Sequence, residues 1–479
     1  MEYDPKKVIC SCSRATCGDV ADAVKAGAKT LEEVRQRTRA TAFCGSCTER
    51  VTAFMEQVLS GQAVPVEAPP AETDLSQQPA AILREVCQDI YMVGASDRRL
   101  DLFENQYPLK NGISYNSYLI LDQKTALLDT VDQSVQEVFL RNLEAGLAGR
   151  KLDHIIVNHM EPDHCAALRA VLERHPESQI VCTAAAKKMI GQFFGPAMEA
   201  RAQEVRDGIS VMLGRHILSF HTAPMVHWPE TMVTYDRTSE TLFSADAFGT
   251  FGALDGNLFA DQVDFERDFM DEARRYYTNI VGKYGAPVQA LLQKAAGLKL
   301  QRICPLHGPV WRRDLGVFLD KYQKWSTYTP EEKGVVIAYA SIYGNTELAC
   351  QALANALSEE GVRDVRMYDV SVTDSSEILS EAFRRSHLVL ASVTFNGGLF
   401  PNMEKLLLEL RSHGLKNRTV ALIENGTWAP VSGRKMQEIL SGMAVTVLEQ
   451  KITLSSTLKQ GQLAEIRTLA KTIAQQILA

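Results

Sequence analysis

Hydrophobic and polar positions follow one another in a regular order over the middle of the chain. Two apolar runs, at 112–121 and 125–130, are separated by a short polar turn and predict a hairpin of buried strands. Further apolar runs at 155–157 and 180–182 predict strands on either side of a stretch at 167–173 that has helical spacing. The pattern predicts a mixed α/β domain.

The C-terminal part alternates more regularly between the two kinds of element. Apolar runs at 335–340, 388–394 and 419–424 predict strands, and the stretch at 346–360 has the spacing of a helix. This order is typical of a doubly wound parallel sheet with helices on both faces.

Two breaks in the pattern divide the chain. The segment 61–83 contains four prolines among Ala, Glu, Ser and Gln and has no periodicity, which indicates an extended linker. The second break precedes the apolar run at 335–340. We therefore expect a small domain at 1–60, the linker, a middle domain at 84–330 and a C-terminal domain at 331–479.

Composition narrows the class of protein. The hydrophobic fraction of 46% and the charged fraction of 23% are typical of globular protein, and the net charge of -7 offers no basic patch for nucleic acid. No signal core follows the N-terminus and no apolar run reaches the roughly 18 residues that cross a bilayer. We expect a cytoplasmic protein that binds neither nucleic acid nor membrane. In that reducing compartment the clustering of the ten cysteines indicates metal chemistry or chance rather than disulfides.

Four cysteines near the N-terminus have ligand spacing. Cys10 and Cys12 form a C-x-C pair, and Cys44 and Cys47 form a C-x-x-C pair. Four thiolates hold either an iron-sulfur cluster or zinc, and a domain this small needs such a centre to be stable. Spacing alone does not choose between the two metals.

These two motifs, Ile9-Cys10-Ser11-Cys12 and Cys44-Gly45-Ser46-Cys47, resemble the bacterioferritin-associated ferredoxin type of domain. The resemblance implies a two-iron, two-sulfur (2Fe-2S) cluster held by these four cysteines. A structural zinc site remains the alternative.

The densest group of ligand-type side chains is His159-Met160-Glu161-Pro162-Asp163-His164, which directly follows the predicted strand at 155–157. His227, Asp246 and His307 also lie at predicted strand ends or in loops. A single histidine is more often packed or exposed than a ligand. Several imidazoles and carboxylates at strand ends together indicate a metal site.

The loop resembles the H-x-H-x-D-H motif of the metallo-β-lactamase superfamily, which binds zinc. Glu161 stands where the zinc hydrolases have histidine, and a carboxylate oxygen suits iron and bridging between metals. The resulting pattern, H-x-E-x-D-H, is that of the flavodiiron proteins, and the similarity runs from about residue 84 to the C-terminus. It implies a metallo-β-lactamase-like αββα domain followed by a flavodoxin-like domain.

The resemblance also implies roles for individual residues. His159, Glu161 and His227 would hold one iron, Asp163, His164 and His307 the other, and Asp246 would bridge them. Family members differ in whether the histidine at position 164 reaches its metal. Tyr115 and Tyr277 are the candidate catalytic residues that would line the pocket, although core packing is the favoured interpretation of both.

Three loops lie at the carboxyl ends of predicted C-terminal strands, where such a sheet binds its ligand. The first is rich in hydroxyl groups and precedes a predicted helix, so it could bind a phosphate or form only a turn and N-cap. The three loops resemble the loops with which flavodoxins bind FMN, except that Tyr343 stands where flavodoxins usually have threonine. No G-x-G-x-x-G fingerprint is present, so we expect no direct NAD binding. The implied FMN contacts are Ser341, Tyr343, Gly344, Asn345, Thr346, Thr394, Phe395, Asn396, Gly397, Asn425, Gly426, Thr427 and Trp428.

The family resemblance implies an enzyme that passes electrons from the 2Fe-2S cluster through FMN to two irons. There it would reduce dioxygen to water or nitric oxide to nitrous oxide, and we expect dioxygen to be the preferred gas. An NAD(P)H-dependent reductase would supply electrons, and the chain would assemble head to tail as a homodimer or homotetramer. The alternatives are a metallo-β-lactamase-fold hydrolase with accessory redox domains and a redox or gas sensor.

Overall fold

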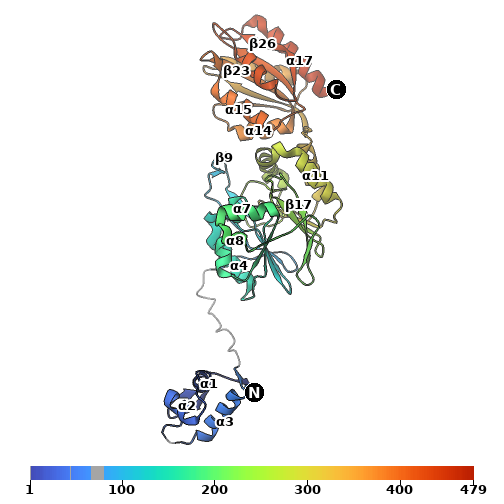
Figure 1. Ribbon diagram of the computed structural model, residues 1–479. Coiled ribbons are helices and arrows are strands. Elements are labelled where there is room, and N and C mark those ends of the chain that lie inside the picture. The colour runs from blue at the N-terminus through green and yellow to red at the C-terminus, as the bar shows by residue number, and fades with distance from the viewer. Residues whose placement is uncertain (1, 44, 66–79) are drawn as a thin grey trace. The chain divides into compact units, whose positions relative to one another are not determined.

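The computed structural model describes residues 2–43, 45–65 and 80–479. The chain divides into two compact units, Met1–Pro79 and Ala80–Ala479 (Figure 1). Much of the expected linker at 61–83, and Cys44, lie outside the described residues.

The N-terminal unit is a small helical domain. Helices α1 and α2 each begin with a capping box, Thr16 with Asp19 and Thr30 with Glu33, which satisfies the free N–H groups of the first turn. Val20, Val34 and Val51, one from each helix, form the centre of its core. The elements are β1 (Glu2–Tyr3), β2 (Val8–Cys10), β3 (Ala15–Thr16), α1 (Cys17–Lys25), α2 (Leu31–Thr38), α3 (Thr48–Leu59) and β4 (Val64–Pro65).

The larger unit begins with two facing sheets covered by helices. The strand order is β15-β14-β13-β12-β11-β6-β5 in the first sheet and β16-β17-β18-β19-β20 in the second. The strands are β5 (Arg84–Cys87), β6 (Ile90–Met92), β11 (Tyr118–Leu121), β12 (Thr125–Leu128), β13 (His154–Ile156), β14 (Gln179–Cys182), β15 (Ala202–Glu204), β16 (Ser210–Met212), β17 (Ile217–Thr222), β18 (Met232–Asp236), β19 (Thr241–Phe243) and β20 (Arg302–Cys304).

Buried side chains from both sheets form one cluster between them, which includes Ile120 and Ile156 of the first sheet and Phe220 and Phe243 of the second. This packing gives the expected αββα arrangement. The helices are η2 (Gln133–Val135), α4 (Gln136–Leu147), α5 (Pro162–Cys165), α6 (Leu168–Arg174), α7 (Ala184–Phe194), α8 (Pro196–Glu199), η3 (Ala260–Gln262), α9 (Phe265–Asp268), α10 (Met270–Tyr276), η4 (Tyr277–Val281), η5 (Gly282–Tyr284), α11 (Gly285–Ala296) and α12 (Leu315–Ser326).

The predicted strand at 112–121 is in fact two strands in different sheets. β10 (Ile113–Tyr115) pairs with β7 (Ala95–Asp97), whereas β11 pairs with β12 and β6. Between them the Asn116 amide donates to the carbonyls of Pro305 (2.9 Å) and Gly308 (2.8 Å). The break therefore ties this segment to the loop that carries His307. A short hairpin, β8 (Leu102–Phe103) and β9 (Tyr107–Pro108), lies between β7 and β10 in sequence.

The C-terminal part is the expected doubly wound parallel sheet, with strand order β22-β21-β23-β25-β26. Neighbouring residues of β21 face opposite sides: Val335 and Ile337 pack in one core, and Val336 and Ala338 in the other. The strands are β21 (Glu332–Ala340), β22 (Val365–Asp369), β23 (Arg385–Phe395), β24 (Gly398–Leu399), β25 (Thr419–Asn425) and β26 (Thr446–Leu454).

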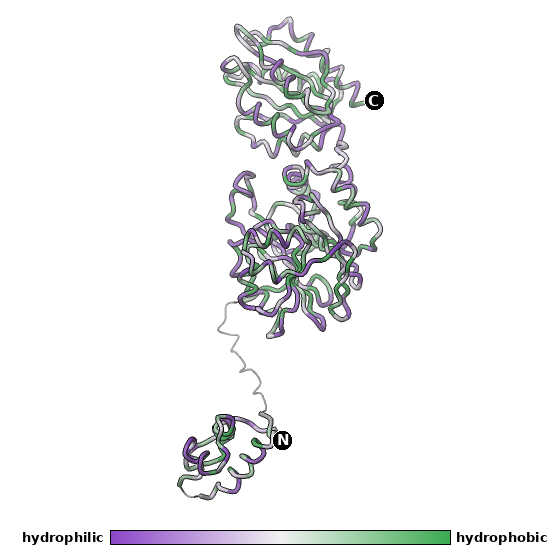
Figure 2. Tube along the Cα trace, in the orientation of Figure 1, coloured by the Kyte–Doolittle hydropathy of each residue, from purple (hydrophilic) through white to green (hydrophobic). Residues whose placement is uncertain are grey.

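Helices α13 (Asn345–Glu359) and α17 (Leu463–Leu478) cover one face of this sheet, and α14 (Ser375–Arg384), α15 (Pro401–Ser412) and α16 (Ser432–Leu440) cover the other, with η6 (Gln460–Gln462) before α17. Hydrophobic residues concentrate along the central strands, as Figure 2 shows. Across the residues that the structure describes, no helix combines the length and the apolar character needed to cross a bilayer.

A buried carboxylate holds the segment that joins the two sheet domains. Glu331 is 1% exposed and accepts hydrogen bonds from Arg274, from Lys321 (2.7 Å) and from the Trp325 indole (2.7 Å). The Arg418 guanidinium, also buried, donates to the Tyr328 carbonyl (2.7 Å). Glu331 is held by side chains of the middle domain, and Arg418 of the C-terminal domain binds a carbonyl on the other side of the joint, so the connection is tightly packed.

Candidate functional site

The loop that follows β13 is held at both ends by buried groups. The Asp129 carboxylate accepts hydrogen bonds from the backbone N–H of Asn158 (2.7 Å) and His159 (3.2 Å). At the other end the Thr130 hydroxyl and N–H both donate to the His164 carbonyl (2.8 Å each). Pro162 is the first residue of α5, where proline is favoured, so the loop turns into a helix with Asp163 and His164 in its first turn.

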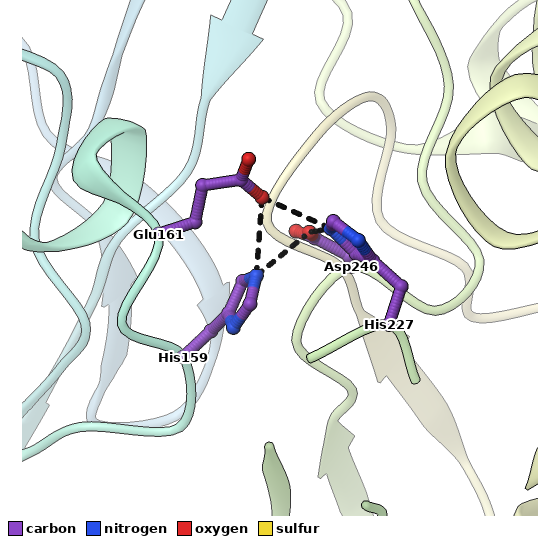
Figure 3. A group of neighbouring side chains, drawn as sticks. All are labelled: His159, Glu161, His227 and Asp246. Carbon is purple, nitrogen blue, oxygen red and sulfur yellow. Dashed lines mark hydrogen bonds and ion pairs between the residues drawn. The ribbon is translucent and has the colours of Figure 1, made fainter. Parts of the chain in front are cut away.

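The first group of facing side chains comprises His159, Glu161, His227 and Asp246 (Figure 3). Glu161 Oε2 lies 3.2 Å from His159 Nε2 and 2.9 Å from His227 Nε2. Asp246 Oδ2 lies 3.3 Å from His159 Nε2 and 3.2 Å from His227 Nε2. Two imidazole nitrogens and two carboxylate oxygens thus converge on one point.

A second group, Asp163, His164 and His307, lies on the other side of Asp246. His164 Nε2 and His307 Nε2 are 3.1 Å apart, and each is 3.3 Å from Asp163 Oδ2. Asp246 Oδ1 lies 3.0 Å from His164 Nε2 and 3.8 Å from His307 Nε2. The two oxygens of Asp246 therefore face different groups, which is the geometry of a bridging carboxylate.

Opposite charges stabilise each other at this buried site. Burial lowers the pKa of His164 and of His227, but the neighbouring carboxylates outweigh it and raise each pKa to about 9. Burial likewise raises the pKa of Glu161 and Asp246, yet the histidines hold both below the usual range. The two carboxylates are therefore ionised, the state in which they bind cations.

The donor set fits two metal ions. Within the described part of the chain, both oxygens of buried Asp163 lack a hydrogen-bond partner, although two imidazole nitrogens lie beside one of them. Buried polar groups are almost always paired, so a carboxylate that faces imidazole nitrogens without hydrogen bonds is suited to binding a cation. Mixed imidazole and carboxylate ligands with a bridging carboxylate suit iron.

The expectation for the two tyrosines needs one correction. The Tyr115 ring lies 5.7 Å from the His307 ring, as expected of a pocket residue. Tyr277 instead packs against Tyr322 (5.0 Å) and Trp325 (5.2 Å), in the aromatic core. Its neighbour Tyr276 faces the site, with its ring 5.4 Å from the His307 ring.

Helix geometry explains this difference, because consecutive helical residues point about 100° apart and only one of an adjacent pair can face the site. A local contact marks Tyr276: a Cβ at Gly249 would lie 3.0 Å from its ring. Sequence reasoning also missed Phe103, whose ring lies 5.6 Å from that of His307.

A separate cavity of about 430 Å³ lies at the carboxyl ends of the C-terminal strands. All three predicted loops line it, and of the predicted contacts only Gly344 does not. Gly344 precedes α13 with φ of +79° and has no side chain to cap the helix. Ser341 Oγ accepts from the Glu347 N–H (3.4 Å), which leaves the other N–H groups of the first turn available to an anion. Further lining residues that sequence reasoning missed are Ile342, Val393, Ala429, Val431 and Ser456.

Polar contacts join these loops. Asn425 Nδ2 donates to the Ser456 carbonyl (2.9 Å) and to Thr346 Oγ1 (3.3 Å), and Thr394 Oγ1 accepts from the N–H groups of Val431 (3.0 Å) and Ser432 (3.3 Å). At the rim Tyr343 and Trp428 are 89% and 91% exposed. A polar floor with a helix N-terminus and exposed aromatic rings at the rim is suited to a phosphate joined to a flat ring system.

In the N-terminal unit, Cys10 and Cys47 are buried and their thiols contact each other, whereas Cys12 is exposed. Burial raises the pKa of Cys10, but contacts with Ser13, the Thr41 backbone and Cys47 outweigh it and lower that pKa to about 6. A thiolate-prone cysteine beside a second buried one is suited to metal ligation.

Three family models match this chain. A "BFD-like [2Fe-2S] binding domain" matches residues 8–57, an "ODP family beta lactamase" matches 113–308 and a "Flavodoxin" matches 337–469. The three matches follow the order of the domains expected from the sequence.

Relatives and solved structures agree with these matches. The "Anaerobic nitric oxide reductase flavorubredoxin" of Vibrio vulnificus is 33% identical over 72% of this chain and 70% of its own length. The "Nitric oxide reductase" of Moorella thermoacetica is 32% identical over 78% of this chain and 92% of its own length. Rubredoxin oxygen:oxidoreductase from Desulfovibrio gigas has a TM-score of 0.77 at 26% identity and covers 83% of this chain and 99% of its own.

The flavodiiron protein of Giardia intestinalis has the same fold, with a TM-score of 0.80 at 24% identity over 84% of this chain and 98% of its own. Identities of 33% and 32% extend over 72% and 78% of this chain and over more than two thirds of each relative. The chain therefore belongs to the flavodiiron protein family.

Proposed function

We propose that this protein reduces nitric oxide or dioxygen at a two-iron centre, with electrons passed from a 2Fe-2S cluster through FMN. One observation carries the proposal: Asp246 lies between two groups of ligand-type side chains and turns one oxygen toward each. A site for two adjacent metals has positions at which a diatomic molecule can bind.

Seven residues form the proposed centre. His159, Glu161 and His227 hold one iron, Asp163, His164 and His307 the other, and Asp246 bridges them. When bound, the irons supply electrons to the gas and a place for it to bind. Phe103, Tyr115 and Tyr276 form an aromatic wall beside His307 that limits the access of water.

The other two cofactors have their own residues. The cavity in the C-terminal domain would hold FMN, with the N-terminus of α13 available to its phosphate and the exposed side chains of Tyr343 and Trp428 to its ring system. Cys10, Cys12, Cys44 and Cys47 hold the cluster, where Cys10 and Cys47 already lie in contact. Electrons enter at the cluster because a small module on its own unit can approach both a reductase and the flavin.

The electron donor is an NAD(P)H-dependent reductase, and the chain assembles head to tail as a homodimer or homotetramer in the cytoplasm.

The names of the two relatives at 33% and 32% identity favour nitric oxide, contrary to the expectation from sequence that dioxygen is preferred. We therefore propose nitric oxide as the faster substrate. Reduction of two nitric oxide molecules consumes two electrons and two protons and yields nitrous oxide and water.

Metal and flavin analysis of protein purified without oxygen tests the proposal. About four irons per chain, two in the cluster and two in the diiron centre, with one FMN, are expected. Steady-state rates with each gas and one reductant then order the substrates. Zinc in the middle domain, or iron without turnover of either gas, would refute the proposed activity and favour the hydrolase or the sensor.

Glu161→His is expected to move the middle domain from iron toward zinc and to reduce gas turnover to background. The change restores the ligand set of the zinc hydrolases by exchanging an anionic oxygen for an imidazole nitrogen. Metal analysis and gas consumption measure the two effects. Glu161→Asp, which keeps a carboxylate, should retain iron, and a Glu161→His protein that retains iron and full turnover would contradict the assignment.

Thr394→Val is expected to weaken FMN binding about tenfold, because the N–H groups of Val431 and Ser432 lose their shared acceptor, a cost of about 1.4 kcal/mol. Quenching of FMN fluorescence during titration of flavin-free protein gives the dissociation constant. Thr472→Val removes a similar hydroxyl on the exposed face of α17 and serves as the control. Equal affinities in both variants would show that Thr394 does not support the flavin loops.

A further inference from the structure

Glu230 is a fully buried carboxylate that belongs to neither ligand group. Glu230 lies between His227 and β18 in the sequence, and its side chain is 0% exposed. Oε1 accepts hydrogen bonds from His159 Nδ1 (2.8 Å) and from the Met160 N–H (2.8 Å). Among the described residues, His159 is the only proposed metal ligand whose side chain Glu230 contacts. Any effect of Glu230 on the centre therefore passes through the His159 ring.

The hydrogen bond between Glu230 and His159 determines how the His159 ring faces the metal centre. A carboxylate at Nδ1 keeps the proton on that nitrogen and leaves the lone pair on Nε2, which lies 3.2 Å from Glu161 Oε2 and 3.3 Å from Asp246 Oδ2. The Trp228 ring packs edge to face against His159 at 5.5 Å and limits its rotation. The imidazole is therefore held in one orientation, with Nε2 facing the two carboxylates of the centre.

The two histidines of the second group have weaker outer contacts. His307 Nδ1 is 2.7 Å from the Ser114 carbonyl, a neutral acceptor. His164 Nδ1 is buried and has no hydrogen-bond partner within the described structure. A carboxylate partner raises the basicity of a ligating imidazole more than a carbonyl does, and an unpartnered ring is the least restrained.

We propose that Glu230 is a positioning residue which makes the His159 group the tighter of the two iron sites, so that the iron beside His164 is released first. The inference rests on the proposed function, because it requires both groups to hold iron. It assigns to the two sites an order of affinity that follows from the outer partners of their histidines.

The ligand loop does not depend on Glu230 for its shape. Asp129 already binds the N–H groups of Asn158 and His159, and Thr130 binds the His164 carbonyl. Glutamine at position 230 would still offer an amide oxygen to His159 Nδ1 and to the Met160 N–H. Glu230→Gln therefore removes the charge and leaves the hydrogen bonds and the fold.

The test measures iron release from the full chain, loaded with all its cofactors and reduced without oxygen. Excess ferrous chelator is added, its coloured iron complex is followed with time, and the cluster is monitored separately by its visible absorption. Two phases of equal amplitude are expected in the unaltered protein. In Glu230→Gln the slow phase should become faster by about 10 to 100-fold, with the fast phase unchanged.

Mössbauer spectra of the same samples give a second readout. One of the two iron signals of the diiron centre should shift in Glu230→Gln while the other stays in place, which a general loss of stability would not produce. Glu230→Asp, which keeps the charge but shortens the side chain, should also speed the slow phase. It serves as the second variant where glutamine yields too little folded protein.

Asp236→Asn is the matched control, because Asp236 forms an equally buried pair with His216 (2.7 Å) outside the site. It should leave both phases unchanged. A slow phase unaffected by both Glu230 variants, a single phase in the unaltered protein, or equal acceleration by Asp236→Asn would overturn the inference. Absence of iron from the middle domain of the unaltered protein would instead refute the proposed function.

Discussion

Replacement of Asp246 with alanine is expected to abolish gas reduction and to remove the diiron centre. Asp246 is 1% exposed, and its two oxygens lie within 3.3 Å of His159 and His227 and within 3.8 Å of His164 and His307. Loss of this carboxylate leaves four imidazoles facing one another without the anion between them. Iron should fall from about four to about two per chain, and turnover by at least about 100-fold.

Iron analysis and Mössbauer spectra measure the loss of the centre, and FMN content shows whether the C-terminal domain remains folded. Asp246→Asn, which keeps one oxygen but no charge, should lie between alanine and the unaltered protein. A coupled two-iron spectrum in Asp246→Ala would count against the bridge, because Asp246 is the carboxylate that turns one oxygen toward each ligand group.

Cys10→Ser with Cys47→Ser is expected to block reduction by the physiological reductase while gas reduction persists when FMN is reduced chemically. Both thiols are buried in the N-terminal unit and touch each other, so serine at both positions removes half of the proposed cluster ligands. The drop in reductase-driven turnover should be at least about 100-fold, because electron entry would lose its first carrier. Deletion of residues 1–83 should have the same effect.

Cys17→Ser is the control for this experiment. Cys17 is buried in the same core but lies outside both cysteine motifs, and burial raises its pKa. It should leave the visible iron-sulfur spectrum and the reductase-driven rate unchanged. If the double serine variant accepted electrons as fast as the unaltered protein, the N-terminal domain would not be the entry point, and a structural zinc site would be the better interpretation.

Much of the architecture follows from local patterns in the sequence. Alternating apolar runs predicted the parallel sheet of the C-terminal domain, and β21, β23 and β25 lie where the runs at 335–340, 388–394 and 419–424 placed them. Such strands are buried on both faces, so their hydrophobic character is continuous and easily recognised. The loops at their ends could be predicted as one site because carboxyl ends of parallel strands meet at one edge.

The composition of the candidate centre was also visible in the sequence. Spacing within the loop from His159 to His164 brought together residue types that bind metal, and Glu161 distinguished iron from zinc ligation. These inferences depend on residue identity and on neighbours along the chain. Partners that lie far away in sequence, such as His307, were recognised through family resemblance rather than through spacing.

Tertiary structure alone decided which residues surround the ligands. The choice between Tyr276 and Tyr277 depends on the rotation of one helix against His307. The break at Asn116 depends on the Pro305 carbonyl, which lies 189 residues further along the chain. Glu230 and His159, which form a hydrogen bond, are 71 residues apart in sequence. Sequence patterns report the periodicity of an element and the chemistry of its residues. They do not report the direction in which a side chain points relative to a distant segment, because that direction is set by packing between elements.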